Sequence, residues 1–221
     1  MDLTIEDEAT SSARSDSRKG RLVGCVLCGG ASRRMGRDKG ALELAGQTLV
    51  ERAAKVLAGI CGEVFLATGN VARYGELGFE PLLDATPDGG PVEGILAALE
   101  HADADLCCVL ACDLPGARLV HFERLLDEVR ESDLDACFYR ASGREHPLLA
   151  VYRTTCAPAM RAARLAGDRR VVAFRDHPGP GGRELRVGSL ELSPDEASFL
   201  RNVNTPEEFA AESRLQDGEA S

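Results

Sequence analysis

The stretch LVGCVLCGGASRRMGRDK, residues 22–39, decides the fold that this sequence predicts. Its first part, residues 22–28, is a short apolar run that ends at a pair of glycines, which is typical of a buried strand entering a turn. Gly29 and Gly30 allow the backbone to approach a ligand closely and to direct N–H groups at it. We therefore expect a ligand site at the carboxyl end of a first strand.

Strands and helices alternate along the rest of the sequence. The apolar patterns predict strands at residues 63–67, 79–83, 106–111, 135–139 and 148–151, and helices at residues 48–60, 92–101, 119–131, 157–165 and from about 206. Alternation of this kind builds parallel strand–helix–strand units, and near-continuous apolar strands indicate a sheet covered on both faces. The predicted fold class is α/β, a Rossmann-like doubly wound three-layer sandwich with a mostly parallel sheet.

The two ends of the chain lack a periodic apolar face. Residues 1–20 are polar and predict a disordered N-terminal tail, and residues 213–221 predict a flexible C-terminal tail. Between them, residues 21–212 predict one domain, and this length is sufficient for a substantial core.

The composition excludes several classes of function. The formal net charge is −10, aromatic residues make up 5%, and there is no Trp. An acidic chain with few stacking side chains argues against nucleic acid and anionic membranes as partners. The sequence shows neither a signal peptide nor an apolar run of the roughly 18 residues that a membrane span requires. We therefore expect a cytoplasmic protein with reduced thiols.

Basic side chains crowd the loop after the first strand, at Arg33, Arg34, Arg37 and Lys39. Like charges this close favour an anion at their centre, and arginine and lysine both bind phosphate. The spacing matches neither a Walker A motif nor G-x-G-x-x-G. The loop is therefore predicted to bind a phosphate-bearing ligand, and the alternative is a solvated basic turn.

Two aspartates follow predicted strands. Asp113 follows the strand at 106–111, where a carboxylate suits Mg²⁺, which prefers oxygen ligands and substrate phosphates. The alternative is a helix cap before Leu119. Asp84 follows the strand at 79–83 and is placed to contact a ribose or base, with an ordinary turn aspartate as the alternative.

Cysteines occur in two groups, Cys25 with Cys28 and Cys107 and Cys108 with Cys112. A zinc or iron–sulfur site is one interpretation. However, residues one or three apart on a strand point to opposite faces, so we favour buried free thiols packed as small apolar groups. The lone His146 is interpreted as a residue at the edge of the site or in a turn.

These residues resemble a known family. Residues 27–39 are similar to the L-x-G-G-x-S-x-R-M-G-x-D-K signature of the NTP-transferase superfamily, and most closely to the molybdenum cofactor guanylyltransferases, the MobA family. The similarity continues through GPVEGI at 90–95, CDLP at 112–115, HP at 146–147, GDRRV at 167–171 and NVNTPEE at 202–208. It departs at Cys28, where the family often has Ala, and at Ala67, where some relatives have a nucleotide-contacting Asn.

The resemblance implies a Mg²⁺-dependent enzyme in which a phosphate of molybdopterin attacks the α-phosphate of GTP and pyrophosphate leaves. Its implied partners are GTP and the molybdopterin cofactor, and it leaves open whether cofactor-delivery proteins present the pterin. The implied residues are, for the nucleotide, Leu27, Cys28, Gly29, Gly30, Lys39, Asp84 and Asp113; for Mg²⁺, Asp113; for catalysis, Arg33, Lys39 and Asp113; and for the acceptor, Asn202 and Asn204. The alternatives are cytidylyl transfer to the pterin, transfer to a sugar phosphate, and a non-catalytic nucleotide-binding protein.

Overall fold

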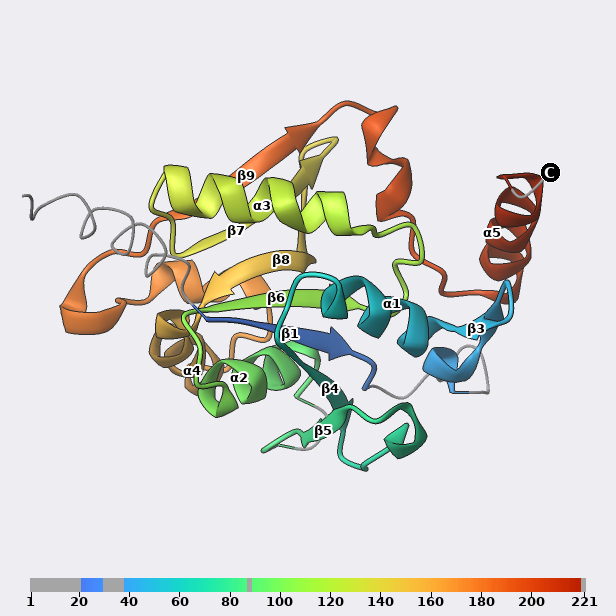
Figure 1. The fold of residues 1–221 in the computed structure, drawn as a ribbon. Coiled ribbons are helices and arrows are strands. Elements are labelled where there is room, and N and C mark those ends of the chain that lie inside the picture. The colour runs from blue at the N-terminus through green and yellow to red at the C-terminus, as the bar shows by residue number, and fades with distance from the viewer. Residues whose placement is uncertain (1–20, 30–37, 87–88, 220–221) are drawn as a thin grey trace, which may run out of the picture.

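The computed structural model describes residues 21–29, 38–86 and 89–219. Seven strands form one sheet in the order β5-β4-β1-β6-β8-β7-β9 (Figure 1). Their bounds are β1 Leu22–Leu27, β4 Glu63–Gly69, β5 Glu80–Leu83, β6 Leu106–Ala111, β7 Ala136–Ala141, β8 Arg144–Arg153 and β9 Val187–Leu192. All neighbours are parallel except β8, which runs antiparallel to β6 and β7. The predicted mostly parallel α/β sheet is confirmed.

Helices cover both faces of the sheet. The helices α1 (Leu49–Ala58) and α3 (Leu119–Glu131) pack into one apolar layer, and α2 (Pro91–His101) and α4 (Ala157–Leu165) pack into the other (Figure 1). The spacing of buried residues on α1, such as Leu49, Ala53 and Leu57, follows the helical repeat that the sequence predicted. The three-layer arrangement is therefore the predicted one.

The chain reverses direction across the sheet between β1 and β6. From β1 it proceeds outward to β4 and β5, and then returns to place β6 on the other side of β1. In doubly wound sheets, ligands bind at such a switch point, outside the carboxyl ends of the strands. The segments that follow β1 and β6 begin at Cys28 and Cys112, and the Cys112 amide donates to the Leu27 carbonyl at 3.1 Å.

Several elements differ from the sequence prediction. The strand expected at 148–151 is the longer β8, because a tight turn at Ser142 and Gly143, both with positive φ, joins it to β7 as a hairpin. The short hairpin of β2 (Glu43–Leu44) and β3 (Gln47–Thr48) and the edge strand β9 were not predicted.

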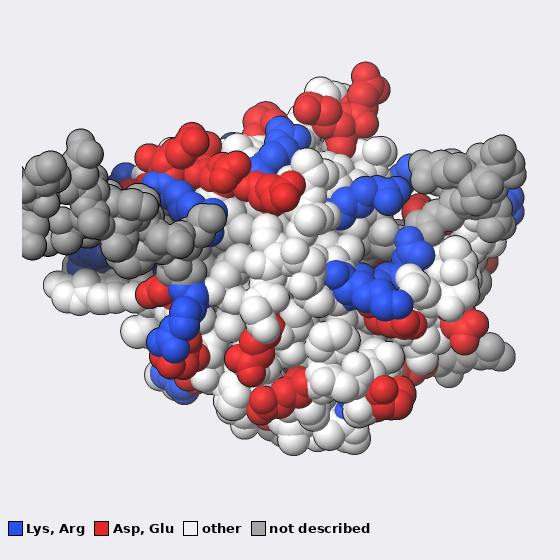
Figure 2. Space-filling model, viewed as in Figure 1, with Lys and Arg blue, Asp and Glu red and all other residues white. Residues whose placement is uncertain are grey.

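At the two ends of the chain, the helix expected from about residue 206 is α5, Pro206–Glu219, and it continues into residues 213–219, where we expected a tail. The expected tail at 1–20 lies outside the described residues. In the part of the chain that the structure describes, no helix is long and apolar enough to cross a membrane. On the face shown in Figure 2, blue and red side chains are interspersed among the described residues and do not form a single basic stripe.

Candidate active site

A cavity of about 1080 Å³ lies at the carboxyl ends of the central strands. Its lining comes from the segments after β1, β4, β5 and β6, from the start of α2, and from residues near the end of the chain. The predicted residues that line it are Leu27, Cys28, Gly29, Lys39, Asp84, Asp113 and Asn204. Residues distant in sequence therefore converge at the predicted edge of the sheet.

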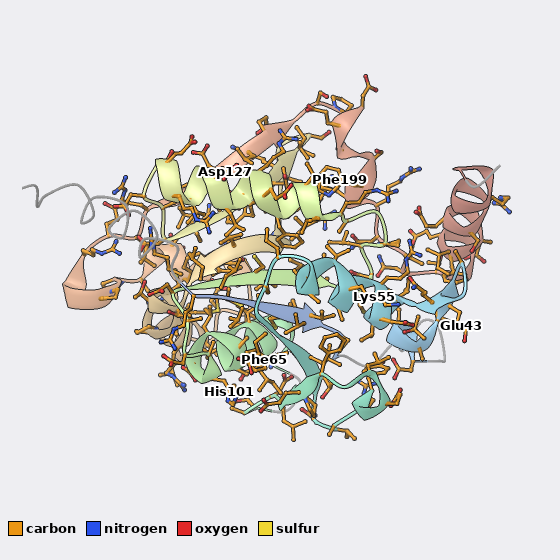
Figure 3. The ribbon with its side chains drawn as sticks, viewed as in Figure 1. Glu43, Lys55, Phe65, His101, Asp127 and Phe199 are labelled. Carbon is orange, nitrogen blue, oxygen red and sulfur yellow. The ribbon has the colours of Figure 1, made fainter. Side chains whose placement is uncertain are left out.

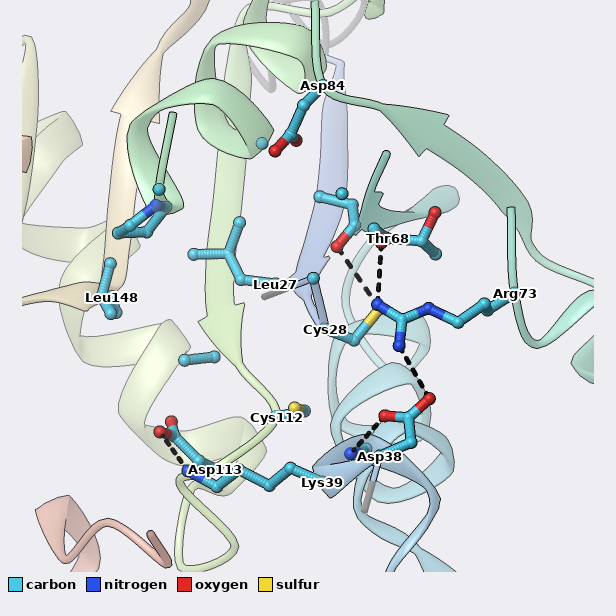
Figure 4. Close-up of a pocket in the computed structure, with 18 of the residues that line it drawn as sticks. Leu27, Cys28, Asp38, Lys39, Thr68, Arg73, Asp84, Cys112, Asp113 and Leu148 are labelled. Atoms are coloured by element: carbon cyan, nitrogen blue, oxygen red, sulfur yellow. Dashed lines mark hydrogen bonds and ion pairs between the residues drawn. The ribbon is translucent and has the colours of Figure 1, made fainter. Parts of the chain in front are cut away.

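The ammonium group of Lys39 joins two of these segments. Lys39 begins the short 3-10 helix η2 (Lys39–Ala41), and its Nζ lies 2.8 Å from Asp113 Oδ2 and 2.6 Å from Asn204 Oδ1 (Figure 4). The Lys39 and Asp113 side chains are 15% and 21% exposed, so water screens this ion pair only in part. The other oxygen, Asp113 Oδ1, is buried and has no hydrogen-bond partner among the described residues.

Asp113 does not cap the following helix. The N-cap of α3 is Arg118, whose amide donates to His121 Nδ1 at 3.0 Å. The structural alternative for Asp113 is therefore wrong, and its carboxylate faces the cavity and Lys39.

Asn204 is held in place by contacts on both sides of it in sequence. The Val203 amide donates to the Asp113 carbonyl at 2.9 Å, and the Asn204 amide donates to Glu208 Oε2 at 2.6 Å. Upstream, the Phe199 ring stacks on His121, with 3.6 Å between ring centroids (Figure 3). These contacts explain how a residue 165 positions after Lys39 reaches the same ammonium group.

The end of β1 forms one wall of the cavity. Gly29 must lack a side chain, because a Cβ there would lie 2.6 Å from the Gly69 amide nitrogen. Burial raises the pKa of the Cys28 thiol to about 12, so this side chain is an uncharged part of the wall. Close-packed backbone and an uncharged side chain therefore form this wall of the cavity.

Asp84 lies at the other end of the cavity from Lys39 (Figure 4). Burial, and then the nearby charge of Glu93, raise the pKa of the Asp84 carboxyl above its usual range. Glu93 itself is 3% exposed and pairs with Arg164 of α4, with 2.6 Å between Oε1 and Nε. The cavity therefore has the Lys39–Asp113 ion pair at one end and the Asp84 carboxyl at the other.

A second cavity, of about 440 Å³, shares Asn204 with the first. Asn202, Arg144 and His146 also line it. Burial, and then the charge of Arg144, lower the pKa of His146, so the imidazole is neutral at neutral pH. Asn204 thus lines both cavities and Asn202 lines the second, whereas His146 lies in strand β8 and not in a turn.

Some predicted residues cannot be placed in this geometry. Gly30 and Arg33 fall within residues 30–37, outside the described residues, as do Arg34 and Arg37. Of the basic cluster after the first strand, the structure therefore places only Lys39.

The sequence assigned no role to several polar side chains of the cavity wall, among them those of Thr68 and Arg73. Thr68 is 1% exposed, and its Oγ1 is buried without a hydrogen-bond partner in the part of the chain that the structure describes. It lies near the carboxyl end of β4, so the strand-end rule that identified Asp84 and Asp113 could have found it. Arg73 also lines the cavity, but it follows no strand directly and had no local signal.

All eight cysteines are buried free thiols. Cys25 packs in the layer beneath α2, whereas Cys28 packs in the layer of α1, and Cys107 and Cys108 divide between the layers in the same way. The expectation that these pairs point to opposite faces is confirmed. Among the described residues, no group of three or more His, Cys, Asp or Glu side chains is arranged to hold a metal ion.

Comparison with known proteins identifies the family and relatives of this chain. Residues 24–179 match the family model of the MobA-like NTP transferase domain. The chain is 34% identical over 194 residues to a molybdenum cofactor guanylyltransferase of Serratia proteamaculans, a match that covers 85% of this chain and 91% of the relative.

Solved structures share the fold. One is molybdopterin-guanine dinucleotide biosynthesis protein A from Archaeoglobus fulgidus, with a TM-score of 0.70, 23% identity, and coverage of 89% of this chain and 99% of that one. Another is 2-C-methyl-D-erythritol 4-phosphate cytidylyltransferase from Thermus thermophilus, with a TM-score of 0.62, 16% identity, and coverage of 87% and 98%. Because the second uses a different nucleotide by name, the fold alone does not specify the base.

Proposed function

The chain belongs to the MobA-like NTP transferase family, and we propose that it transfers GMP from GTP to the phosphate of the molybdopterin-bound molybdenum cofactor. Pyrophosphate leaves, and the product is the guanine dinucleotide form of the cofactor. Relatives that carry the name of this activity match nearly their full length. The observation that carries the proposal is the contact of Lys39 with both Asp113 and Asn204, which joins the two halves that such a reaction requires.

The larger cavity is proposed as the GTP site. Its volume of about 1080 Å³ suits a large ligand. The base and ribose would occupy the end lined by Leu27, Gly29 and Asp84, and the triphosphate would extend toward Lys39. Lys39 would offset negative charge on the phosphates, and Arg33 of the signature would add to this, as the resemblance implies.

The residues present fit a Mg²⁺ ion beside Asp113. Asp113 Oδ1 is a buried carboxylate oxygen without a partner, and Mg²⁺ commonly takes one or two carboxylates and completes its coordination with water and substrate phosphates. When bound, Mg²⁺ would supply charge neutralisation at the reacting phosphates. Lys39 on the other carboxylate oxygen, Oδ2, would hold the Asp113 side chain in a fixed orientation beside the cavity.

The smaller cavity is proposed as the site of the acceptor. It opens beside Asn204, the residue that also contacts Lys39, so an acceptor phosphate near Asn204 would lie beside the GTP phosphates. The Asn202 and Asn204 amides supply both donors and acceptors for a polar heterocycle, and Arg144 adds a positive charge.

The chemistry requires little covalent help from the protein. An oxygen of the acceptor phosphate forms a bond to the α-phosphorus of GTP as the bond to the pyrophosphate oxygen breaks. Positioning and charge neutralisation are the main contributions that a protein makes to such a transfer. Lys39 is placed to supply both, and no side-chain nucleophile is needed.

Thermal stabilisation by GTP, CTP, ATP and UTP, each with Mg²⁺, tests the nucleotide, and release of pyrophosphate with molybdopterin tests the acceptor. We expect GTP to raise the melting temperature most and pyrophosphate release to require molybdopterin. Clear preference for CTP would refute the guanylyl assignment. Pyrophosphate release with a sugar phosphate in place of molybdopterin would refute the acceptor.

A further inference from the structure

The carboxylate of Asp38, the residue before Lys39, is fixed by three hydrogen bonds. Its Oδ1 accepts from the Tyr74 hydroxyl at 2.5 Å and from the Gly40 amide at 3.2 Å, and its Oδ2 accepts from Arg73 Nη1 at 2.8 Å. A carboxylate with these donors is largely satisfied within the protein. Asp38 therefore connects the turn that carries Lys39 to the segment that follows β4.

Arg73 extends this connection to the sheet. Its second amino group, Nη2, donates to the Thr68 carbonyl at 2.9 Å, so the guanidinium bridges Asp38 and the end of β4 (Figure 4). Although Arg73 lines the cavity, both of its terminal nitrogens donate hydrogen bonds to other groups of the protein. The Arg73 guanidinium is therefore placed to hold Asp38 rather than to bind a ligand.

Tyr74 adopts a conformation that its surroundings must impose. Its φ of 63° and ψ of 27° lie in the left-handed region, which costs energy for a bulky residue. The residue is only 9% exposed, and burial followed by the hydrogen bond to Asp38 raises the pKa of the hydroxyl, which therefore stays a donor. A Cβ on Gly40 would lie 2.5 Å from the Tyr74 hydroxyl oxygen, so the turn fits closely against this ring.

We infer that Arg73 and Tyr74 are positioning residues that act through Asp38 to fix the turn from which Lys39 reaches Asp113 and Asn204. The inference rests on the proposed function for the reaction that this positioning serves. Lys39 has a long flexible side chain, and its ammonium group contributes to transfer only when it is held at the phosphates. Without the bonds to Asp38, the turn would move and Lys39 would spend less time at Asp113.

Chemical labelling of lysines tests the positioning without reference to any substrate. The chain has three lysines, at positions 19, 39 and 55. The Lys39 side chain is 15% exposed and the Lys55 side chain 56%, so Lys55 serves as an internal reference in the same molecule. Acylation of the full chain with an acetylating reagent, followed by mass spectrometry, gives the ratio of the Lys39 rate to the Lys55 rate. We expect Tyr74→Phe and Arg73→Met each to raise this ratio at least about threefold, because the local opening that exposes Lys39 becomes easier.

Matched controls share the chemistry of these changes but lie elsewhere. Tyr152→Phe removes a buried hydroxyl that donates to the Pro147 carbonyl at 2.7 Å. Arg153→Met removes a guanidinium that likewise bridges a carboxylate and a carbonyl, with side-chain exposure of 30% against 31% for Arg73. Both controls should leave the ratio unchanged. An unchanged ratio in either Tyr74→Phe or Arg73→Met, with the melting curve showing a folded protein, would overturn the inference.

Kinetics with GTP separates positioning from direct contact. We expect Tyr74→Phe and Asp38→Asn each to lower kcat about tenfold while the KM for GTP changes less than about threefold. The double variant should be no slower than Asp38→Asn alone, because both changes break one connection. If the kcat losses of the two single variants multiply in the double variant, the inference is contradicted. If the parent shows no guanylyl transfer, the proposed function fails, and the labelling ratio still decides the role of Arg73 and Tyr74.

Discussion

Replacing Lys39 by methionine is the most informative perturbation of the site. Methionine keeps most of the aliphatic length and removes the charge that contacts Asp113 at 2.8 Å and Asn204 at 2.6 Å. A unit charge about 4 Å from a phosphate charge is worth about 4 kcal/mol at an effective dielectric constant of about 20. Since about 1.4 kcal/mol corresponds to a factor of ten in rate, the upper bound is a loss of roughly a thousandfold. Residual water at a side chain that is 15% exposed reduces this, and we expect kcat/KM to fall about 100- to 1000-fold.

The assay is pyrophosphate release from GTP with molybdopterin as acceptor. Lys55→Met is the matched control, because Lys55 forms an exposed ion pair with Glu51 at 2.8 Å that is worth little to stability and lies outside the cavity. The control should keep the parent rate. If folded Lys39→Met retained kcat/KM within about tenfold of the parent, the electrostatic role worked out here for Lys39 would be refuted.

Three further predictions concern the metal, the turn and the pH dependence. Asp113→Asn should raise the Mg²⁺ concentration for half-maximal activity at least about tenfold, and undiminished activity of the parent in a chelator would contradict this. Gly40→Ala should destabilise the fold by about 1–3 kcal/mol through its clash with Tyr74, measured by denaturant unfolding, whereas Gly62→Ala, with no atom within 4 Å of the new Cβ, should cost less. Burial, with two neighbouring arginines, lowers the pKa of His121 from 6.5 to about 4, so its neutral form adds stability above pH 6.5 that is lost as the pH falls toward 4. His121→Gln should therefore flatten the melting-temperature profile between those pH values, and an unchanged slope there would show that other groups dominate.

Much of the fold was predictable because its central strands are apolar throughout. The residues of β1 and β6 are buried on both faces of the sheet. Their uninterrupted apolar sequences are typical of strands in a sheet that is covered on both faces. The strand β9 was missed because it lies at the sheet edge, with exposed residues and with Gly188 as its second residue. The direction of β8 was not predictable from its own residues, since the hairpin depends on the turn at Ser142 and Gly143.

The candidate site likewise contains residues that the sequence could predict and residues that it could not. Gly29, Asp84 and Asp113 could be predicted because each lies within two residues of the end of a strand, and the carboxyl ends of parallel strands meet at one edge. Arg73 could not be predicted, because its partners Asp38 and Thr68 become neighbours only when the turn before α1 packs against the end of β4. No local sequence pattern predicts that contact.

Asn204 shows why the proposed acceptor half of the site is harder to derive than the proposed nucleotide half. It lies in a loop, after the last strand, and only the resemblance to the family marked it in the sequence. In the structure its place depends on the Val203 bond to the Asp113 carbonyl and on the stacking of Phe199 on His121, which are contacts between the end of the chain and its middle. The nucleotide half is therefore built by the sheet itself, whereas the acceptor half exists only after the C-terminal segment has packed onto it. Because Lys39 contacts both Asp113 and Asn204, a change in that packing reaches the ammonium group directly, even when every strand of the sheet is intact.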